Sequence, residues 1–221
     1  MSRTFHIRFG DNIATGFVID VDDRQYFVTA KHVLADAAEE FVLSIFHDGD
    51  WRDVTARLVG HCEGEIDITV ASLPILLAHS EFVLKPCMAG VSIGHDAYFL
   101  GYPYGFLGIM SSLTNDYPIP FVKRAIVSSM QMSPNGPCVF FLDGHNNPGF
   151  SGGPVVVKIP GSNDFKVVAV ISSYRFTNEN TYHAGKQLEI TYKSNTGIII
   201  SYGIRHAVDI ANANPIGFEI T

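Results

Sequence analysis

Short runs of β-branched and aromatic residues recur along the whole chain, each bounded by glycine, aspartate, asparagine or proline. Runs of this length between turn residues are typical of β-strands. Only residues 31–38, with room for one or two turns, and 204–212, with apolar residues on one side, are expected to be helical. About six strands are expected in each half of the chain, near residues 5–9, 16–21, 26–30, 40–46, 52–59, 67–72, 97–101, 122–130, 138–142, 154–158, 167–173 and 197–202.

The segment between the two groups of strands, residues 73–92, is less regular and contains two prolines. We read it as an inter-domain connection, with one domain at residues 1–85 and the second at residues 86–221. Closing a sheet into a barrel hides its edges. We therefore predict an all-β fold of two six-stranded antiparallel β-barrels with a short C-terminal helix. Residues 102–121 and 174–196 are expected to be long loops, and loops of such length are more often functional than accidental.

Composition and charge exclude several classes of protein. Hydrophobic residues make up 47% of the chain and charged residues 17%, which excludes intrinsic disorder. The net charge of −7 argues against nucleic acid and against an anionic membrane as partners. The N-terminus lacks the apolar region of a secretory signal, and the uncharged residues 97–115 contain too much glycine and proline for a membrane span.

The cysteines and histidines show no metal-ligand spacing, so no metal and no cofactor is expected. Cys62, Cys87 and Cys138 are interpreted as small buried hydrophobic residues. Their odd number favours a reducing, cytoplasmic location.

The most informative segment is Asn-Pro-Gly-Phe-Ser-Gly-Gly-Pro at residues 147–154, with Ser151 among glycines. A nucleophilic hydroxyl needs close access for the substrate and backbone N–H groups that converge on the oxyanion. Gly149 can turn its N–H inward, beside that of Ser151. A glycine-rich hairpin turn with an incidental serine is the alternative. The nucleophile elbow of α/β-hydrolases is excluded because a strand-like run, and no helix, follows Pro154.

A serine nucleophile needs a base, and histidine is the natural base at neutral pH. Of the nine histidines, His32 differs because it follows an apolar strand that would present it at a cleft, although a histidine in such a place, taken alone, is more often a packed or surface residue. The base needs a buried carboxylate to orient it. Asp67, at the head of an apolar strand, is the best candidate, and a strand-capping acid is its alternative. Asp36 and Asp53 have less apolar surroundings.

Taken jointly, these segments resemble the trypsin-like serine peptidases, most closely the bacterial HtrA-type (Deg-type) branch. The order histidine, aspartate, serine matches, and so do the motifs Thr-Ala-Lys-His-Val at 29–33, Ile-Asp-Ile at 66–68 and the glycine-rich segment at 147–154. The resemblance runs from about Thr15 to Ala211. Supporting segments lie at residues 15–19, 100–105 and 168–173.

The resemblance implies two perpendicular barrels with the site in the cleft between them. It implies that His32 is general base and then acid, that Asp67 orients it, and that Ser151 is the nucleophile of an acyl-enzyme reaction on peptide bonds. The N–H groups of Gly149 and Ser151 would form the oxyanion hole. A polypeptide substrate would add as an extended strand beside Ile171, Ser172, Ser173 and Tyr174.

Some positions depart from the family pattern. Phe150 stands where many secreted relatives have an aspartate that receives a freed N-terminus, so activation by N-terminal cleavage is not expected. Neither a PDZ-like domain nor a trimerisation segment is expected, which argues against assembly into a cage. His145 matches the floor of the side-chain pocket and would favour an acidic or polar side chain, unless it only packs or bonds to Asp143. Tyr174 would narrow the mouth of that pocket.

Three functions remain open on the sequence. The first is a cytoplasmic serine endopeptidase, which the intact set His32, Asp67 and Ser151 favours. The second is a catalytically silent domain that binds a partner. The third is a protease that an activating protein partner switches on by ordering residues 102–121 and 174–196.

Overall fold

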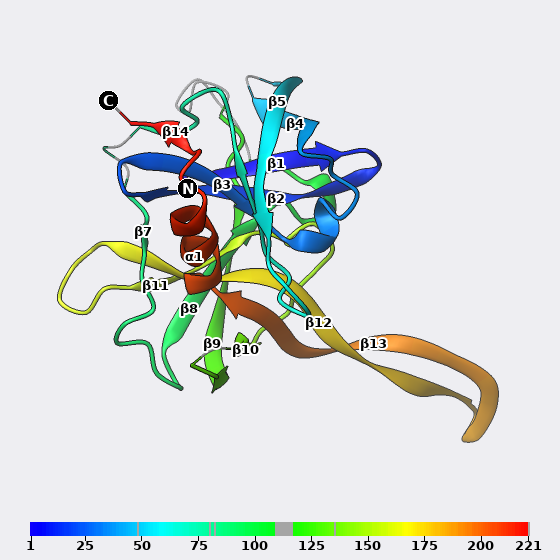
Figure 1. The fold of residues 1–221 in the computed structure, drawn as a ribbon. Helices are drawn as coiled ribbons and strands as arrows, with labels where there is room; N and C mark the ends of the chain where they lie inside the picture. Colours follow the sequence, from blue (N-terminus) through cyan, green and yellow to red (C-terminus); the bar gives the residue numbers. More distant parts are fainter. Residues whose placement is uncertain (48, 80, 82, 109–116, 135, 221) are drawn as a thin grey trace.

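The computed structural model describes residues 1–47, 49–79, 81, 83–108, 117–134 and 136–220, and within them the strands form two seven-stranded sheets (Figure 1). The first sheet has the order β14-β3-β2-β1-β4-β5-β6, and an additional pairing of β3 with β6 closes six of its strands into a barrel. Its strands are β1 (Thr4–Phe9), β2 (Asn12–Val21), β3 (Arg24–Thr29), β4 (Glu40–His47), β5 (Asp50–His61), β6 (Thr69–Ser72) and β14 (Phe218–Glu219).

The second sheet has the order β11-β8-β9-β10-β13-β12-β7, and a pairing of β11 with β12 closes it in the same way. Antiparallel pairs make up both closed barrels, while β7 pairs with β12 in parallel. Its strands are β7 (Lys85–Pro86), β8 (Asp96–Gly101), β9 (Phe121–Met132), β10 (Cys138–Asp143), β11 (Pro154–Lys158), β12 (Phe165–His183) and β13 (Lys186–Gly203).

The predicted all-β fold of two six-stranded barrels is confirmed, and every expected strand is present. Two of them are much longer than expected, because β12 continues past residue 173 to His183 and β13 begins at Lys186 instead of residue 197. The C-terminal helix is α1 (Arg205–Ala213), and the helical segment expected at residues 31–38 is a single 3₁₀ turn, Lys31–Val33. No helix in the described ranges is long and apolar enough to cross a membrane.

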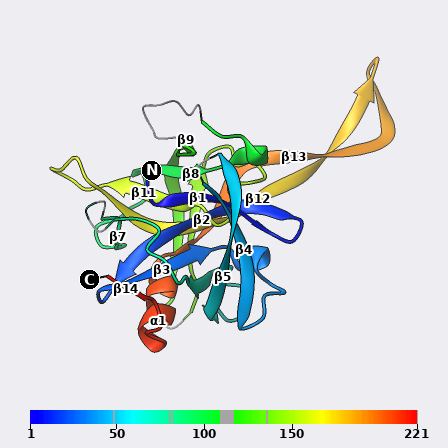
Figure 2. The same cartoon turned by 90° about the horizontal axis from the view of Figure 1, so that it is seen from above.

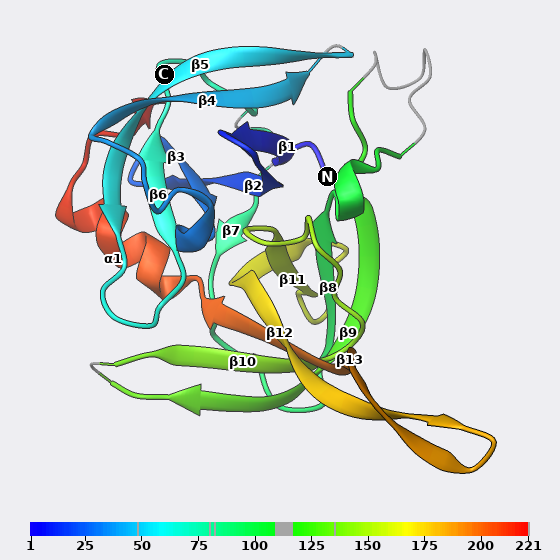
Figure 3. The same ribbon diagram turned by 90° about the vertical axis from the view of Figure 1, so that its right-hand side faces the viewer.

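The prediction of a long loop at residues 174–196 is wrong. β12 and β13 run through this segment as one long hairpin that projects from the barrel (Figures 1, 2 and 3). Its tip is Ala184-Gly185, both at positive φ, which is the backbone of a two-residue type I′ turn. The other expected loop, 102–121, lies partly outside the described residues; its described part contains a 3₁₀ turn at Pro103–Gly105.

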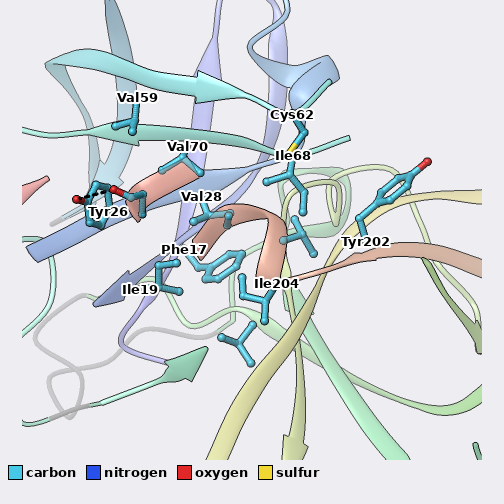
Figure 4. Packing of buried hydrophobic residues seen from close by; sticks show 14 of the residues in the cluster. Phe17, Ile19, Tyr26, Val28, Val59, Cys62, Ile68, Val70, Tyr202 and Ile204 are labelled. Atoms are coloured by element: carbon cyan, nitrogen blue, oxygen red, sulfur yellow. Dashed lines mark hydrogen bonds between the residues drawn. The ribbon is translucent and has the colours of Figure 1, made fainter. Parts of the chain in front are cut away.

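A hydrophobic cluster joins the two barrels and the helix (Figure 4). Phe17 and Val28 enter it from the first barrel, Val170 and Tyr202 from the second, and Ala207 from α1. Separate clusters fill the interior of each barrel. The buried surface between the barrels therefore fixes their relative position.

The C-terminal segment returns to the first barrel. The hydroxyl of Tyr26 donates to the carbonyl of Ala211 over 3.3 Å, and the side-chain amide of Asn214 donates to the carbonyl of Val59 over 3.1 Å. β14 then pairs with β3. The division at residues 85 and 86 stays a proposal, in which α1 and β14 belong to the second domain by sequence but pack on the first barrel.

The shared cluster predicts a large effect of Phe17→Ala, because Phe17 is fully buried where the barrels meet. Removing a buried phenylalanine side chain costs about 3–5 kcal/mol in the free energy of unfolding. Urea denaturation measures this cost. The exposed Val42 provides the control Val42→Ala, expected to change stability by less than about 0.5 kcal/mol. A loss below about 1 kcal/mol for Phe17→Ala would contradict the packing described.

Candidate active site

His32 and Asp67 meet because two paired strands end side by side. Thr29 of β3 pairs with Thr69 of β6, so the 3₁₀ turn Lys31–Val33 that follows β3 lies beside the residues that precede β6. Asp67 Oδ2 lies 2.7 Å from His32 Nδ1, and Asp67 Oδ1 accepts the backbone N–H of His32 over 2.8 Å. This two-point contact fixes both the position and the orientation of the imidazole ring.

Ser172, in β12 of the second barrel, completes the surroundings of this carboxylate by donating its hydroxyl to Asp67 Oδ2 over 2.6 Å. Burial by itself would raise the pKa of Asp67. The hydrogen bond and charge of His32, together with the hydrogen bonds from Ser172 and the His32 backbone, outweigh burial and lower the pKa below its ordinary value of 3.8. The carboxylate therefore stays ionised at neutral pH, as an acceptor for the Nδ1–H of His32.

Ser151 follows β10 and precedes β11, and its hydroxyl donates to the carbonyl of Ser172 over 3.1 Å. Ser172 thus contacts both Asp67 and Ser151. Within the described part of the chain, no hydrogen bond joins the Ser151 hydroxyl to His32, whose side chain is 53% exposed. His32 and Asp67 open onto a pocket of about 490 Å³ between the barrels, lined by Lys31, His32, Ala35, His61, Glu65, Asp67, Ser172 and Tyr202.

Two backbone donors beside the Ser151 hydroxyl are unused. Among the described residues, nothing accepts the N–H of Gly149 or the N–H of Ser151. The carbonyl of Pro148 accepts the N–H of Tyr104 over 2.9 Å. Because N–H and C=O point in opposite directions across a trans peptide, the N–H of Gly149 faces away from Tyr104. Gly149 has φ +101°, and a Cβ there would lie 2.2 Å from the carbonyl oxygen of Tyr102, so only glycine fits.

Thr15, a fully buried residue of β2, ties this loop to the first barrel. Its N–H donates to the carbonyl of Ser151 over 3.0 Å, and its hydroxyl donates to the carbonyl of Gly149 over 2.6 Å. The same hydroxyl accepts the N–H of Tyr102, and the carbonyl of Thr15 accepts the hydroxyl of Thr29. Sequence reasoning missed this role, because one threonine in a strand-like run carries no signal for it.

A buried side-chain amide lies next to His145, the residue predicted at the floor of the side-chain pocket. His145 is exposed, and its carbonyl accepts the ammonium of Lys123. The neighbouring Asn146 is 2% exposed, and its side-chain amide nitrogen lies 3.5 Å from the carbonyl of Ser173. Its main-chain carbonyl accepts the side-chain amide of Asn195. Sequence reasoning did not single out Asn146 or Asn195.

The strand expected to pair with substrate is β12, and its residues differ in whether their main-chain groups are already hydrogen-bonded. Ile171 is buried, and both its N–H and its carbonyl are bonded, to Gly153 and Gly152 respectively, each over 2.8 Å. Ser173 is exposed and Tyr174 half-buried on the same strand. The open edge of β12 therefore begins after Ile171.

Burial of two of the three cysteines agrees with the sequence-based expectation, which is wrong for the half-buried Cys87. Cys62 and Cys138 are buried, Cys87 is half-buried, and all three are free thiols. Burial raises the pKa of Cys62 to about 12, so this thiol stays protonated. In the described ranges no group of histidine, cysteine and acidic side chains has the arrangement of a metal site.

Comparison with known proteins gives a family model and structural neighbours. The model of the trypsin-like peptidase domain matches residues 14–161. The fold is similar to that of an inactive-form serine-to-alanine mutant of Rv3671c from M. tuberculosis H37Rv, with TM-score 0.60 and 17% identity over 97% of this chain and 87% of that chain. It is also similar to the HtrA-type protease AlgW with tripeptide, with TM-score 0.59 and 18% identity over 96% of this chain and 58% of that chain. No curated protein matches the chain in sequence.

The role of Thr15 is tested by Thr15→Val, which keeps the shape of the side chain and removes the hydroxyl. The carbonyl of Gly149 and the N–H of Tyr102 then lose their partner inside the protein. Leaving buried polar groups unpaired costs about 1–3 kcal/mol of unfolding free energy, measurable by urea denaturation. Thr55→Val, at an exposed position of β5, is the control and should cost less than about 0.5 kcal/mol. Equal effects of the two variants would contradict the role of Thr15.

The contact between Ser172 and Asp67 is tested by Ser172→Ala. The hydroxyl bonds to the ionised carboxylate, so its loss should raise the pKa of Asp67. A lowered pKa stabilises the fold above pH 3.8, the ordinary value, and that stabilisation is lost as the pH falls through the folded-state pKa. In the variant this loss should begin at higher pH. Carboxyl NMR titration reports the pKa directly, with Ser128→Ala as control; an unchanged pKa would show that Ser172 is irrelevant to Asp67.

Proposed function

The chain belongs to the family of trypsin-like peptidases, and we propose on that basis that it is a serine endopeptidase acting through an acyl-enzyme intermediate. Ser151 is the nucleophile, His32 the general base and then acid, and Asp67 the residue that orients His32. The observation that carries the proposal is the pair of contacts between Asp67 and His32, together with Ser172, which donates its hydroxyl to Asp67 and accepts the Ser151 hydroxyl on its carbonyl.

In the first half-reaction, the Asp67 carboxylate holds the Nδ1–H of His32, so Nε2 is the free base. Nε2 takes the Ser151 proton while Oγ attacks the peptide carbonyl. The N–H groups of Gly149 and Ser151 stabilise the oxyanion. The His32 imidazolium then protonates the leaving amine, and an acyl-serine remains.

In the second half-reaction, His32 takes a proton from a water molecule that attacks the acyl-serine, and the proton returns to Ser151 Oγ when the acid product leaves. Both halves use the same base and the same two backbone donors. No cofactor or metal takes part in this scheme.

Substrate binding itself would align the nucleophile. The Ser151 hydroxyl donates to the carbonyl of Ser172. A polypeptide that adds to β12 as a strand places one of its own N–H groups on that carbonyl. The hydroxyl is then displaced and free to turn toward His32 by rotation about one side-chain bond.

Further elements of the proposal concern specificity, location and partners. The substrate is a polypeptide that pairs with Ser172, Ser173 and Tyr174 on the open edge of β12, and His145 contributes to the side-chain pocket.

The protein acts in the cytoplasm on protein substrates, with no nucleic acid or membrane partner. A protease activated by a protein partner is the second candidate, favoured by the Ser151 hydroxyl that bonds to Ser172 instead of His32.

The assignment of the nucleophile is tested with a fluorophosphonate probe, with and without cell lysate. The probe should label the wild-type chain, and Ser151→Ala should abolish labelling because the reactive oxygen is gone. Ser128→Ala, at an exposed strand position, should label normally. Labelling that needs lysate would favour the partner-activated enzyme, and labelling that survives in Ser151→Ala would refute the assignment.

The role of Asp67 is tested by Asp67→Asn. This change should reduce kcat by about 10⁴, because His32 is then held in the wrong tautomer.

A further inference from the structure

The outer part of the β12–β13 hairpin, residues 176–195, is a two-stranded ribbon that extends away from the barrels (Figures 1 and 3). β11 pairs with β12 only as far as Val170, and β10 pairs with β13 only from Ile198 onward. Beyond these points no described strand covers either edge. The ribbon exposes five large apolar side chains, which are Phe176, Tyr182, Leu188, Ile190 and Tyr192. An isolated two-stranded ribbon is marginally stable in water, so a further strand would stabilise it.

The hydrogen bonds show which edge of β12 each residue faces. The carbonyl of Arg175 accepts the hydroxyl of Thr196 on β13 and so faces the partner strand, at a point where the register shifts between Tyr174 and Phe176. Across a trans peptide the N–H of Phe176 points the opposite way, to the open edge. From Phe176 to Asn180 the pairing with β13 is regular. Main-chain groups alternate between the two edges along a strand. Those of Tyr174, Phe176, Asn178 and Asn180 therefore face the open edge.

This open edge is continuous with the candidate active site. The carbonyl of Ser172 faces the same side, since it accepts the Ser151 hydroxyl. From Ser172 to Asn180, every second residue presents main-chain donors and acceptors along one line. The line begins at the nucleophile and ends far out on the ribbon.

From this geometry we propose that the open β12 edge of the ribbon binds the substrate segment that precedes the scissile bond, as a third strand. This inference rests on the proposed function. Counted one for one in an antiparallel pair from Ser172 to Asn180, the bound segment is about nine residues long. The preferred substrates are accordingly long, unfolded polypeptides, and short peptides are poor ones.

Phe176 gives the ribbon a side-chain preference as well. The residue is 52% exposed, and the ammonium of Lys193 lies 4.4 Å from the centroid of its ring. In the same register, the substrate residue opposite Phe176 is about the fifth before the scissile bond. An aromatic or β-branched side chain there would form a favourable cross-strand pair. The site therefore selects an extended segment with an apolar residue at about this position.

The experiment uses casein, an unfolded polypeptide, as the first substrate of the full chain. Mass spectrometry maps a cleavage site, and nested peptides carry four, six, eight and ten residues before that site. We expect kcat/KM to rise about tenfold from the shortest to the longest peptide, since each added pair of residues contributes main-chain hydrogen bonds. Replacing the fifth residue by glycine in the longest peptide should remove part of this gain.

Two proline variants of the ribbon separate its edges. Asn178→Pro removes an N–H from the open edge of β12. Thr191→Pro is the matched control. Thr191 of β13 pairs with Asn180 of β12, and the main-chain groups of Asn180 point away from β13. The main-chain groups of Thr191 therefore point away from β12, to the outer edge of β13. Asn178→Pro should lower the ratio of kcat/KM between the longest and shortest peptides severalfold. Thr191→Pro should keep the wild-type ratio.

The outcomes distinguish this inference from the proposed function. A chain that labels with fluorophosphonate and cleaves casein but shows no dependence on peptide length overturns the ribbon's role alone. Equal effects of the two proline variants do the same. A wild-type dimer that Asn178→Pro converts to a monomer, seen by light scattering, would mean that a second copy covers this edge and would also overturn the role. A chain that neither labels nor cleaves overturns the proposed function, and the inference with it.

Discussion

The candidate site depends on hydrogen bonds that hold a loop of one barrel against a strand of the other. Thr15 supplies two of them, through its N–H to the carbonyl of Ser151 and its hydroxyl to the carbonyl of Gly149. The same contact explains a glycine: a Cβ on Gly152 would lie 2.1 Å from the hydroxyl oxygen of Thr29 and 2.2 Å from the carbonyl oxygen of Thr15. The glycine-rich sequence around Ser151 is therefore required by the close approach of two barrels as much as by the shape of the loop itself.

Much of the fold could be predicted from the sequence because strand signals are local. Runs such as Val155–Val157 are buried on a closed barrel, and turn residues mark their ends. The contact of His32 with Asp67 could be predicted for the same reason, since both residues lie next to strands that pair. Ser151 was singled out by its own glycine-rich segment, and the resemblance in motif order joined it to the other two residues.

The rest of the structure depended on information that is not local. The hairpin was missed because its turn uses Ala184 at positive φ, where a sequence signal would be asparagine or glycine, and because both faces of the ribbon are exposed and show no alternation. Thr15 and Asn146 act through contacts with distant segments. Ser172 was expected to bind substrate, and its hydrogen bond to Asp67 follows only from the position of β12 beside the first barrel.

The docking of α1 on the first barrel has a consequence for synthesis of the chain. Strands β1 to β6 emerge from the ribosome first, but Ala207 and Ala211, which pack beside Phe17 and Val70, follow only near residue 211. Until then the part of the first barrel that α1 covers stays exposed. A nascent chain of this kind exposes an aggregation-prone surface for most of its translation, so its yield in a cell should depend on chaperones that bind such faces while elongation continues.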